Sequence, residues 1–304
     1  MKLSVIVCTR NRAGNIRGCL DSIVAALTQA SPINAEIVVV DNASDDDTSA
    51  VVRAFANSCP FSVHLQLEPR LGLSCARNCG LRAAQGELIV WTDDDCRLSK
   101  DYIVNALRHD AADTEVVLRG GRIELGDPLD LPLSIKTSRT IERWHRSMRS
   151  ARSKNLGNSL AGCNMVMRRA LVDRLGPFDE RFGTENIRGS DDTEYIFRAY
   201  LAGIMIEYVP DMVVFHHHGR RERAAGTKLM RNYLIGTGAA YAKYILKEPD
   251  LCRQFYWDIK GLIMEIITRR NGYMPEIDFS YMMKISCNML GAAKYLFSLT
   301  KRPI

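Results

Sequence analysis

LIVWTDDDC, residues 88–96, is a short apolar run that leads directly into three adjacent aspartates. Ionised carboxylates this close together repel one another by about 1 kcal/mol per pair in water, and by about 4 kcal/mol per pair in a half-buried site. Hydration and backbone donors in a loop can offset this repulsion. A divalent cation such as Mg²⁺, which typically takes one or two carboxylates together with substrate phosphates, can also do so. The triplet by itself leaves both interpretations open.

The N-terminal half alternates short apolar runs with helical patterns, which is typical of a parallel sheet covered by helices. Strands are predicted at residues 3–8, 36–40, 63–67 and 88–92, and helices at residues 15–30, 47–57 and 73–85. The three aspartates then follow a strand directly. Because open parallel sheets bind ligands at the carboxyl ends of their strands, we expect a ligand site there.

Polar residues also follow the other predicted strands. Thr9 and Arg10 come after the first strand, and Asp41 comes after the second. Arg77 lies on the helix that follows Gly72 and can reach an anion, although taken alone it fits an exposed helix position better. Both signs of charge therefore gather where a nucleoside diphosphate would need them.

Six segments, in their order and spacing, resemble the family 2 glycosyltransferases with the GT-A nucleotide-sugar-binding fold. They are VIVCTRNR (5–12), VVVDNASDDDT (38–48), GLSCARNCG (72–80), TDDDC (92–96), GCNMVMRRALVDRLGPFDERFG (162–183) and GSDDTEYIFRAYLAG (189–203). The resemblance implies an α/β fold with a Rossmann-like, mostly parallel central sheet flanked by helices, followed by a helical C-terminal extension. It also implies an inverting transferase that depends on a nucleotide sugar.

The resemblance, together with the change of pattern near residue 222, divides the chain into two units. Residues 1–222 are the expected GT-A catalytic domain, with a nucleotide-binding part at 1–97 and an acceptor-binding part at 98–222. Residues 223–304 are the expected helical region.

The same resemblance implies a donor-binding role for four residues of the first part. Asp41 would contact the nucleotide base, Thr9 and the adjacent Arg10 would lie against the nucleoside, and Arg77 would hold the nucleotide or its phosphates. The implied donor is a nucleotide sugar, with a UDP-sugar as the first choice.

For the aspartate triplet, the resemblance implies that Asp93 touches the ribose and that Asp95 binds the metal ion, with Asp94 beside them in the donor site. The metal is Mn²⁺ or Mg²⁺, and the sequence does not distinguish them. Such an ion bridges phosphate oxygens and neutralises the leaving diphosphate.

Three consecutive histidines in VVFHHHG (213–219) follow an apolar strand and suggest further metal ligands. Strand alternation puts His216 and His218 on one side. Members of the resembled family often carry a histidine near the metal in this region, which favours one of these two as a ligand. A polar surface loop remains the alternative.

GSDDTEY (189–195) supplies the expected catalytic base. By resemblance Asp192 is the base, and Asp191 stands where the family usually has glutamate. A carboxylate suits the task, because it can take the proton of an acceptor hydroxyl. Alternatively Ser190 caps a helix whose first turn holds both aspartates, where the helix dipole stabilises them without any catalytic role.

The basic residues of 136–154 number seven against one acid. Spacings of three and four predict a helix with a basic face, suited to the phosphates of a substrate or of a membrane surface, or simply to solvent. The segment holds one aromatic residue, Trp144, and no nucleic-acid motif is recognised elsewhere, so nucleic acid is not an expected partner.

Helices are predicted at residues 226–247, 250–269 and 279–299. Such an amphipathic region either packs on the neighbouring domain or, being rich in Lys and Arg, lies on anionic lipid at the inner face of the membrane. The apolar stripe of the second helix consists of Leu251, Phe255, Ile259, Leu262 and Ile266.

The composition is that of an ordinary soluble globular chain, with 46% hydrophobic residues and a net charge of +6. The first apolar run is too short for a signal-peptide core and lacks a cleavage site, which predicts a cytoplasmic protein. The nine cysteines show no paired zinc spacing, so reduced structural thiols are expected.

These features together predict a metal-dependent, inverting glycosyltransferase that moves a sugar onto a hydroxyl of a glycan or of a lipid-linked acceptor. Two other classes stay open. A sugar nucleotidyltransferase would need a glycine-rich phosphate loop beside the first strand, where CTRNRAG (8–14) offers little glycine. A non-catalytic nucleotide-sugar-binding protein would keep Asp41 and Asp95 without needing Asp192.

Overall fold

A mixed β-sheet forms the centre of the structure, a computed structural model that describes residues 2–148, 156–270 and 272–300. Its strands are β1 (Leu3–Thr9), β2 (Ala35–Asp41), β3 (Ser62–Leu67), β4 (Leu88–Asp93), β5 (Cys96–Leu98), β6 (Val117–Leu125), β7 (Glu142–Trp144), β8 (Met165–Arg168) and β9 (Met205–His216). Within the described residues they form one nine-stranded sheet in the order β3-β2-β1-β4-β8-β6-β9-β5, and β7 pairs with β9 beside this path. Strands β1 to β4 run parallel, whereas β8 is antiparallel to β4 and β6.

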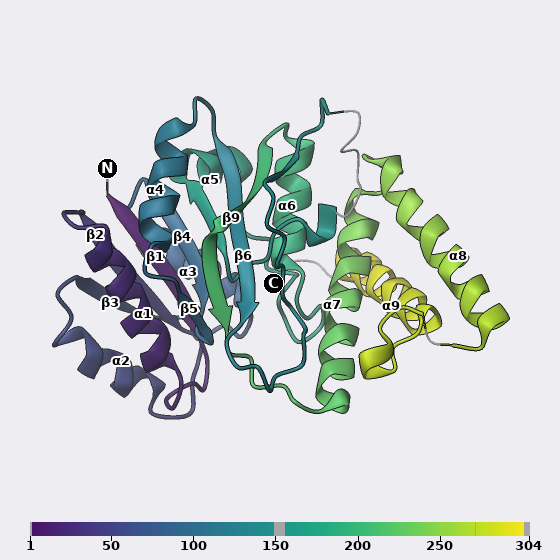
Figure 1. Ribbon diagram of the computed structural model, residues 1–304, viewed down its shortest axis with the longest axis horizontal. Coiled ribbons are helices and arrows are strands. Elements are labelled where there is room, and N and C mark those ends of the chain that lie inside the picture. Colours follow the sequence, from purple (N-terminus) through teal and green to yellow (C-terminus); the bar gives the residue numbers. More distant parts are fainter. Residues whose placement is uncertain (1, 149–155, 271, 301–304) are drawn as a thin grey trace.

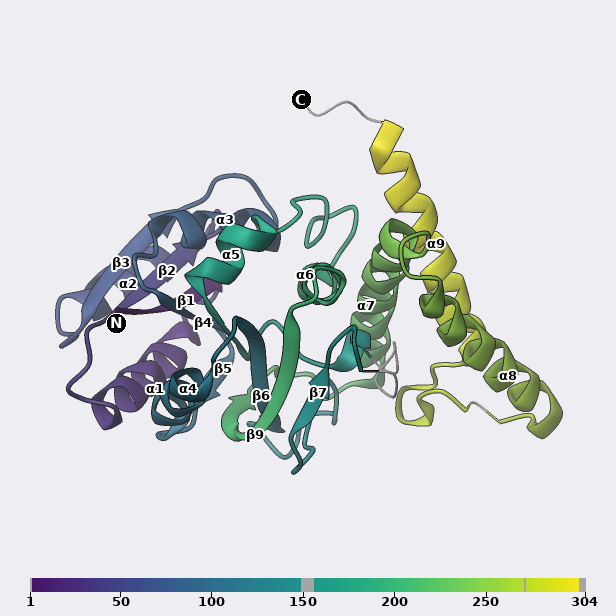
Figure 2. The ribbon, with the colours of Figure 1, turned by 90° about the horizontal axis from the view of Figure 1, so that it is seen from above.

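Helices cover both faces of the sheet (Figure 1). They are α1 (Ile16–Gln29), α2 (Thr48–Ala56), α3 (Leu73–Ala83), α4 (Tyr102–Ala112), α5 (Arg169–Leu175), α6 (Asp191–Leu201), α7 (Arg223–Tyr244), α8 (Cys252–Thr268) and α9 (Tyr281–Thr300). Figure 2 shows α1 and α4 on one face, and α3 and α5 on the other. Alternation along β1 explains the division, because Val5 packs with Leu20 of α1 in one core cluster and Ile6 packs with Leu81 of α3 in the other.

The strand register assembles one edge of the sheet. Thr9 at the end of β1 is in register with Asp41 of β2, and the residue before Thr9 is in register with Asp93 of β4. Further across the sheet, β5 pairs Cys96 with His216 of β9. Side chains that are far apart in the sequence therefore meet at the carboxyl ends of the parallel strands.

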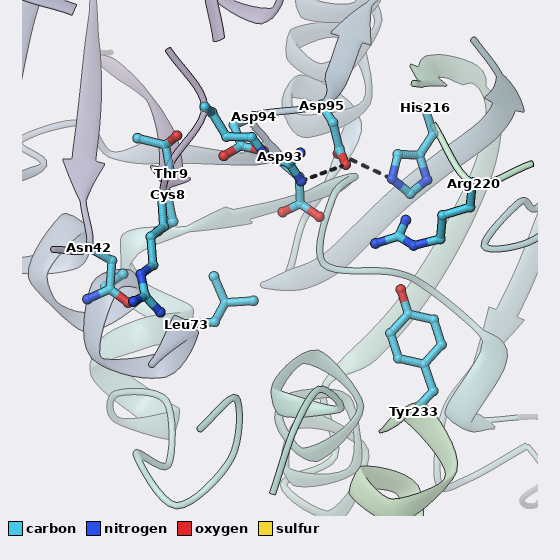
Figure 3. Close-up of a pocket in the computed structure, with 13 residues that line it drawn as sticks. Cys8, Thr9, Asn42, Leu73, Asp93, Asp94, Asp95, His216, Arg220 and Tyr233 are labelled. Atoms are coloured by element: carbon cyan, nitrogen blue, oxygen red, sulfur yellow. Dashed lines mark ion pairs between the residues drawn. The ribbon is translucent and has the colours of Figure 1, made fainter. Parts of the chain in front are cut away.

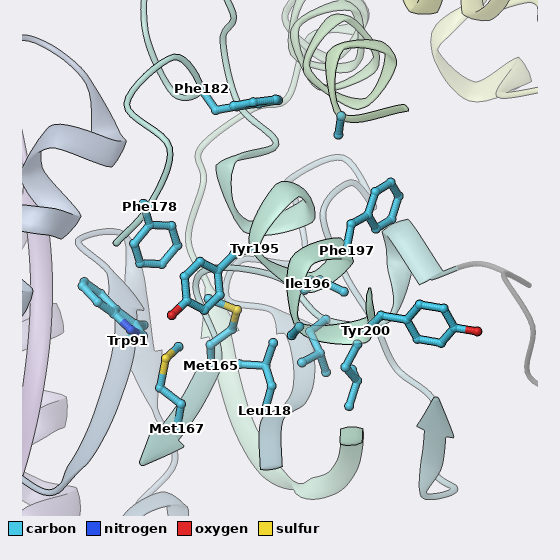
Figure 4. Packing of buried hydrophobic residues seen from close by; sticks show 14 of the residues in the cluster. Trp91, Leu118, Met165, Met167, Phe178, Phe182, Tyr195, Ile196, Phe197 and Tyr200 are labelled. Atoms are coloured by element: carbon cyan, nitrogen blue, oxygen red, sulfur yellow. The ribbon is translucent and has the colours of Figure 1, made fainter. Parts of the chain in front are cut away.

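An aromatic stack fixes α6 to the sheet (Figure 4). Trp91 of β4 meets Phe178 edge-on, with ring centroids 5.6 Å apart, and Phe178 stacks on Tyr195 of α6 at 4.4 Å. Such pairs contribute about 0.5–1.5 kcal/mol each beyond the burial of their area. They hold the start of α6 at a defined position relative to the end of β4.

Three long helices follow the sheet. Glycines let α7 and α9 approach closely, because a Cβ atom on Gly238 would lie 2.1 Å from the carbonyl oxygen of Asn288, and one on Gly291 would lie 1.8 Å from that of Ile235. Helix α8 packs beside α9 on the side away from the sheet (Figure 2). None of the helices in the described residues is long and apolar enough to cross a membrane.

The predicted elements agree closely with the structure. Each strand and helix expected in the N-terminal half is present with ends within two residues, and the three C-terminal helices begin and end within three residues of their predicted ends. The α/β fold with a helical C-terminal extension is thereby confirmed. The sheet joins strands from both parts of residues 1–222, and the proposed division into parts stays a prediction.

The helix predicted across the basic segment is wrong for residues 136–148, and residues 149–155 lie outside the described ones. This stretch contains strand β7, and three of its cations, Lys136, Arg143 and Arg146, make separate ion pairs. Arg143 bonds Glu207 of β9 at 2.7 Å, and Lys136 bonds Glu142 at 3.0 Å. Spacings of three and four residues fit either a basic helix face or these separate ion pairs, and periodicity alone could not distinguish the two arrangements.

Candidate active site

A cleft of about 310 Å³ opens at the carboxyl edge of the sheet (Figure 3). Its walls come from the ends of β1, β2 and β4, the first turns of α3, the loop after β9, and α7. The lining residues are Cys8, Thr9, Arg10, Arg12, Asn42, Leu73, Ala76, Asp93, Asp94, Asp95, His216, Arg220 and Tyr233. Thr9, Arg10, Asp93, Asp94, Asp95 and His216 were predicted from the sequence as site residues, and the fold brings these six together.

Asp95 and His216 form a charged pair on the wall of the cleft. Nε2 of His216 lies 3.2 Å from Oδ1 of Asp95, and both side chains are buried. Burial alone would lower the pKa of His216, but the hydrogen bond to Asp95 raises it to about 9. A metal ion bound here would have to displace that proton, as metal binding to histidine generally does.

The donor atoms fit a divalent cation. One ligand atom each from Asp95, His216 and the neighbouring Cys96 lie within 4.8 Å of one another, and Nδ1 of His216 has no hydrogen-bond partner among the described residues. Burial raises the pKa of the Cys96 thiol well above its usual range, so a metal ion bound to this sulfur would also have to displace its proton. Asp95 and His216, as carboxylate and imidazole, are the ligands we favour from this group.

His218 does not join this group. Strand β9 ends at His216, so the alternation that predicted two ligands does not continue to position 218. Nε2 of His218 lies 3.0 Å from the carbonyl oxygen of Leu131, and its Nδ1 accepts the backbone N–H of Arg220 at 3.0 Å. Both ring nitrogens thus hold the loop, and we leave His218 out of the ligand set proposed below.

Arg12 neutralises part of the aspartate triplet. Its guanidinium lies 3.3 Å from Asp94 and 3.6 Å from Asp95. Burial raises the pKa of Asp94 to about 6, and Arg12 acts against that shift. The repulsion expected within the triplet is therefore offset by a cation of the chain itself. Arg12 belongs to the segment that ends β1, but its position opposite the triplet requires the fold.

The end of the cleft next to β1 and β2 contains a buried hydroxyl. Oγ1 of Thr9 makes no direct hydrogen bond among the described residues, although its interaction with Asp94 helps to lower the pKa of that carboxyl. Asn42 fixes the adjoining loop, because its side-chain amide donates to the carbonyl oxygens of Glu68 and Arg70. The Asn42 side-chain oxygen accepts the N–H of Gly72, whose φ of +142° suits glycine. Asn42 was not among the site residues predicted from the sequence.

Asp41 lies at the end of β2 as predicted but does not line the cleft in this structure. One carboxylate oxygen accepts the N–H of Ser44 at 2.9 Å, and the other accepts the hydroxyl of Ser49. Its carboxylate is thus engaged in ordering the loop before α2. Contact between Asp41 and a nucleotide base stays a prediction.

Arg77 reaches an anion, as the sequence suggested, but that anion is Asp191. The two side chains form a buried ion pair between α3 and the first turn of α6, and Arg77 also lies 3.8 Å from Asp93. Burial raises the pKa of Asp191 to about 6, with Arg77 opposing the shift, so the carboxylate is ionised at neutral pH. Asp191 is therefore occupied in positioning α6.

Asp192 lies beside Asp191 but has different partners. Its Oδ2 accepts the N–H of Gly162 at 2.7 Å, and its Oδ1 accepts the N–H of Thr193 at 2.7 Å. No cation pairs with it among the described residues. These two bonds orient the carboxylate and leave lone pairs for a further donor.

Ser190 does not cap α6 with its side chain. It has a positive φ of 57°, and its hydroxyl donates instead to the carbonyl oxygen of Tyr233 on α7. This bond ties the start of α6 to the helix that forms the far wall of the cleft. Tyr233 and Arg220 face the triplet from that side (Figure 3), and neither stood out in the sequence.

Comparison with known proteins now adds to this geometry. The family model described as "Glycosyl transferase family 2" matches residues 4–176, more than half of the chain. The chain belongs to glycosyl transferase family 2. It is thus a glycosyltransferase, as the resemblance implied, and the sugar nucleotidyltransferase alternative is set aside.

Named relatives of this family 2 glycosyltransferase agree. Glycosyltransferase AglE of Haloferax volcanii is 25% identical over 266 residues, which cover 86% of this chain and 81% of AglE. The succinoglycan biosynthesis protein ExoM of Rhizobium meliloti is 25% identical over 265 residues, covering 85% of this chain and 80% of ExoM.

Solved structures confirm the GT-A fold of the family 2 glycosyltransferase. The mannosyltransferase PcManGT from Pyrobaculum calidifontis, in complex with GDP-Man and Mn²⁺, superposes with a TM-score of 0.66 at 21% identity, covering 97% of this chain and 87% of PcManGT. S. aureus TarS 1-349, in complex with UDP-GlcNAc, gives a TM-score of 0.58 at 19% identity, covering 87% of this chain and 77% of that one.

Proposed function

We propose that this glycosyltransferase uses a nucleotide-sugar donor, with a UDP-sugar as the first choice, and a divalent metal ion, Mn²⁺ or Mg²⁺. It transfers the sugar with inversion onto a hydroxyl of a glycan or of a lipid-linked acceptor. The observation that carries the proposal is the placement of Asp95 and His216, 3.2 Å apart, in a cleft at the carboxyl ends of β1 and β4.

The metal end of the proposed site consists of Asp95 and His216. When bound, the metal ion neutralises charge that develops on the departing diphosphate. Arg12 and Arg220 line the same cleft and add positive charge of the chain itself. In PcManGT the complex holds Mn²⁺ with its nucleotide sugar, which supports this assignment.

The nucleoside end consists of Thr9, Asp93 and the loop that Asn42 holds. The Thr9 hydroxyl makes no direct hydrogen bond among the described residues and can bind a polar group of the nucleoside. Asp93 is the most open of the three aspartates, with 38% of its side chain exposed, and suits a ribose hydroxyl. The two structural neighbours are complexes with nucleotides of different bases, GDP-Man and UDP-GlcNAc, so the base preference is to be measured directly.

Asp192 is the proposed base. It takes the proton from the acceptor hydroxyl while that oxygen forms a bond to the anomeric carbon of the sugar. The bond from that carbon to the diphosphate oxygen breaks, and its electron pair leaves with the nucleoside diphosphate. A single displacement of this kind inverts the anomeric configuration. Asp191, although adjacent, is committed to Arg77 and acts as a positioning residue.

The test is a panel of UDP- and GDP-sugars with and without Mn²⁺, scored by thermal stabilisation and by slow donor hydrolysis. We expect stabilisation by one nucleotide class that needs the metal and is lost in Asp95→Asn. A metal-independent response to every nucleotide, or none at all, would overturn the proposal.

The matched pair for the base is Asp192→Asn and Asp191→Asn. Asp192→Asn should keep metal-dependent donor binding while turnover falls by about a hundredfold or more. Full turnover in Asp192→Asn would remove this residue from the mechanism. The anomeric configuration of the product, read by NMR against that of the donor, checks inversion independently.

A further inference from the structure

Helix α8 presents an apolar face that nothing in the described residues covers. Side chains recurring every three to four residues along it are about half exposed or more, from 49% for Met264 to 69% for Ile267. At 100° per residue they fall within half of the helix circumference. This α8 face consists of Tyr256, Trp257, Ile259, Ile263, Met264, Ile266 and Ile267.

The opposite side of α8 is the one that packs on the protein. Phe255 meets Tyr241 of α7 with ring centroids 5.4 Å apart, and Asp258 accepts a bond from Nζ of Lys284 at 2.8 Å. A Cβ atom on Gly261 would meet the ring of Tyr281 at 2.5 Å. The α8 face is therefore the outer surface of a docked helix and is not needed for the fold.

The predicted apolar stripe of this helix divides between the two sides. Leu251 and Phe255 point inward, whereas Ile259 and Ile266 are 53% and 67% exposed. Helix α9 adds exposed apolar side chains of its own, among them Met289 at 66%. Isolated exposed apolar residues are normal, but a continuous face of this size marks an interaction surface.

Charge distinguishes the occupants this surface can take. Lys260 lies on the α8 face with Nζ 5.2 Å from the ring centre of Trp257, and Arg269 and Arg270 follow at its end. None of these three cations makes an ion pair within the described part of the chain. The two acids of α8 are held on the inner side, since Asp258 bonds Lys284 and Glu265 accepts backbone N–H groups. The outward charge of α8 is thus positive only.

We infer that the α8 face binds the surface of an anionic phospholipid bilayer. An interfacial helix combines an apolar face, aromatic residues at the level of the headgroups, and flanking cations. The adjacent rings of Tyr256 and Trp257, 5.3 Å apart, supply the aromatic part. Lys260, Arg269 and Arg270 supply attraction to acidic headgroups. A second copy of the chain would bring the same positive charges to the contact, which favours an anionic surface as the occupant.

The inference stands independently of the donor site, because no residue of the α8 face lines the cleft. The test is flotation of the full chain with vesicles of phosphatidylcholine alone, or with equal parts of phosphatidylcholine and phosphatidylglycerol. We expect binding to the anionic vesicles that weakens as salt is raised, and little binding to the neutral ones. Absence of binding to the anionic vesicles overturns the inference.

Variants distinguish binding through the α8 face from non-specific adsorption of the protein to vesicles. Trp257→Glu combined with Ile267→Glu should lower partitioning by about tenfold or more. Leu129→Glu is the matched control, because Leu129 is 68% exposed in a loop on another part of the surface. Lys260→Gln with Arg269→Gln and Arg270→Gln should remove the preference for the anionic vesicles. Equal loss in Leu129→Glu overturns the assignment to α8.

A second copy of the chain is the competing occupant. Light scattering on the purified protein without lipid measures directly whether it is a monomer or a dimer. A monomeric protein that floats with the anionic vesicles supports the inference of bilayer binding. A stable dimer that does not float, and that Trp257→Glu dissociates, overturns this inference. Donor-induced thermal stabilisation should be unchanged in all these variants, which shows that they remain folded.

Discussion

Arg77 and Asp191 form an ion pair that is almost closed to solvent, with 3% and 4% of the two side chains exposed. The guanidinium also lies 5.3 Å from the ring centre of Phe178, within the aromatic stack between β4 and α6. One arginine thus joins α3, the end of β4 and the first turn of α6. The helix that carries Asp192 is thereby fixed relative to the aspartate triplet.

The pair predicts opposite phenotypes for two adjacent aspartates. Asp191→Asn removes the direct ion-pair partner of the buried Arg77 and leaves Asp93 at 3.8 Å, so we expect a loss of about 3–5 kcal/mol in the free energy of unfolding. Asp192→Asn changes hydrogen bonds from Gly162 and Thr193 and should cost about 1 kcal/mol. Urea unfolding of both variants measures this. If Asp191→Asn unfolds like the wild type, the pair does not anchor α6.

Thr9→Val tests the buried hydroxyl in the cleft. Among the described residues the substitution removes only a weak interaction with Asp94, so the free energy of unfolding should change little. The hydroxyl is proposed to bind the nucleotide, so donor affinity should fall about three- to tenfold. Isothermal titration with UDP and Mn²⁺ measures the affinity.

The matched control is Thr92→Val. Oγ1 of Thr92 is also buried and makes no hydrogen bond with the residues that the structure describes, but Thr92 does not line the cleft. Its donor affinity should equal that of the wild type. An equal loss of affinity in both variants would indicate an indirect packing effect rather than a contact with the donor.

Gly238→Ala should destabilise the chain, because the added methyl group would meet the Asn288 backbone at 2.1 Å where α7 crosses α9. Overpacking of this kind typically costs about 1–3 kcal/mol. Gly14→Ala is the control, since nothing lies within 4 Å of its added Cβ atom. Thermal unfolding of the two variants gives the comparison, and equal melting temperatures would contradict the close crossing.

Asp179 gives a pH dependence of stability. Burial would raise its pKa, but hydrogen bonds from Arg181 and from Lys243 of α7 hold the pKa well below its usual range. The folded pKa is thus lower than the unfolded value of about 3.9. The stabilisation is therefore fully present above about pH 5 and is lost as pH falls through and below the unfolded pKa.

The free energy of unfolding of the wild type and of Asp179→Asn, measured at evenly spaced pH values between pH 3 and pH 7, tests this effect. The difference in the free energy of unfolding between the two proteins should be largest near neutral pH and should become smaller as the pH is lowered. Asp21→Asn, which removes an exposed pair with Arg17, should cost less than about 1 kcal/mol. A gap that widens with acidification would show the sign to be wrong.

Local sequence was sufficient wherever a segment contains its own signal. Continuous apolar runs such as Leu88–Trp91 predicted strands that are buried on both faces, and the polar residues after them marked the ligand edge. Neither the hydrogen bonds of His218 nor the strand at Glu142–Trp144 could be found this way. In both cases the deciding partner is far along the chain, Leu131 in the first and β9 in the second.

The sequence by itself determined the order of elements up to β4 and in the C-terminal region, the glycosyltransferase family and the approximate position of the site. Periodicity and short motifs are properties of consecutive residues, so they can be recognised in the sequence alone. Only the tertiary structure decided that Arg12 faces the triplet, that Arg77 pairs with Asp191, and that no described residue covers the outer side of α8. Each of these depends on which charge or apolar surface meets another across the fold, and desolvation and pairing are set by that meeting.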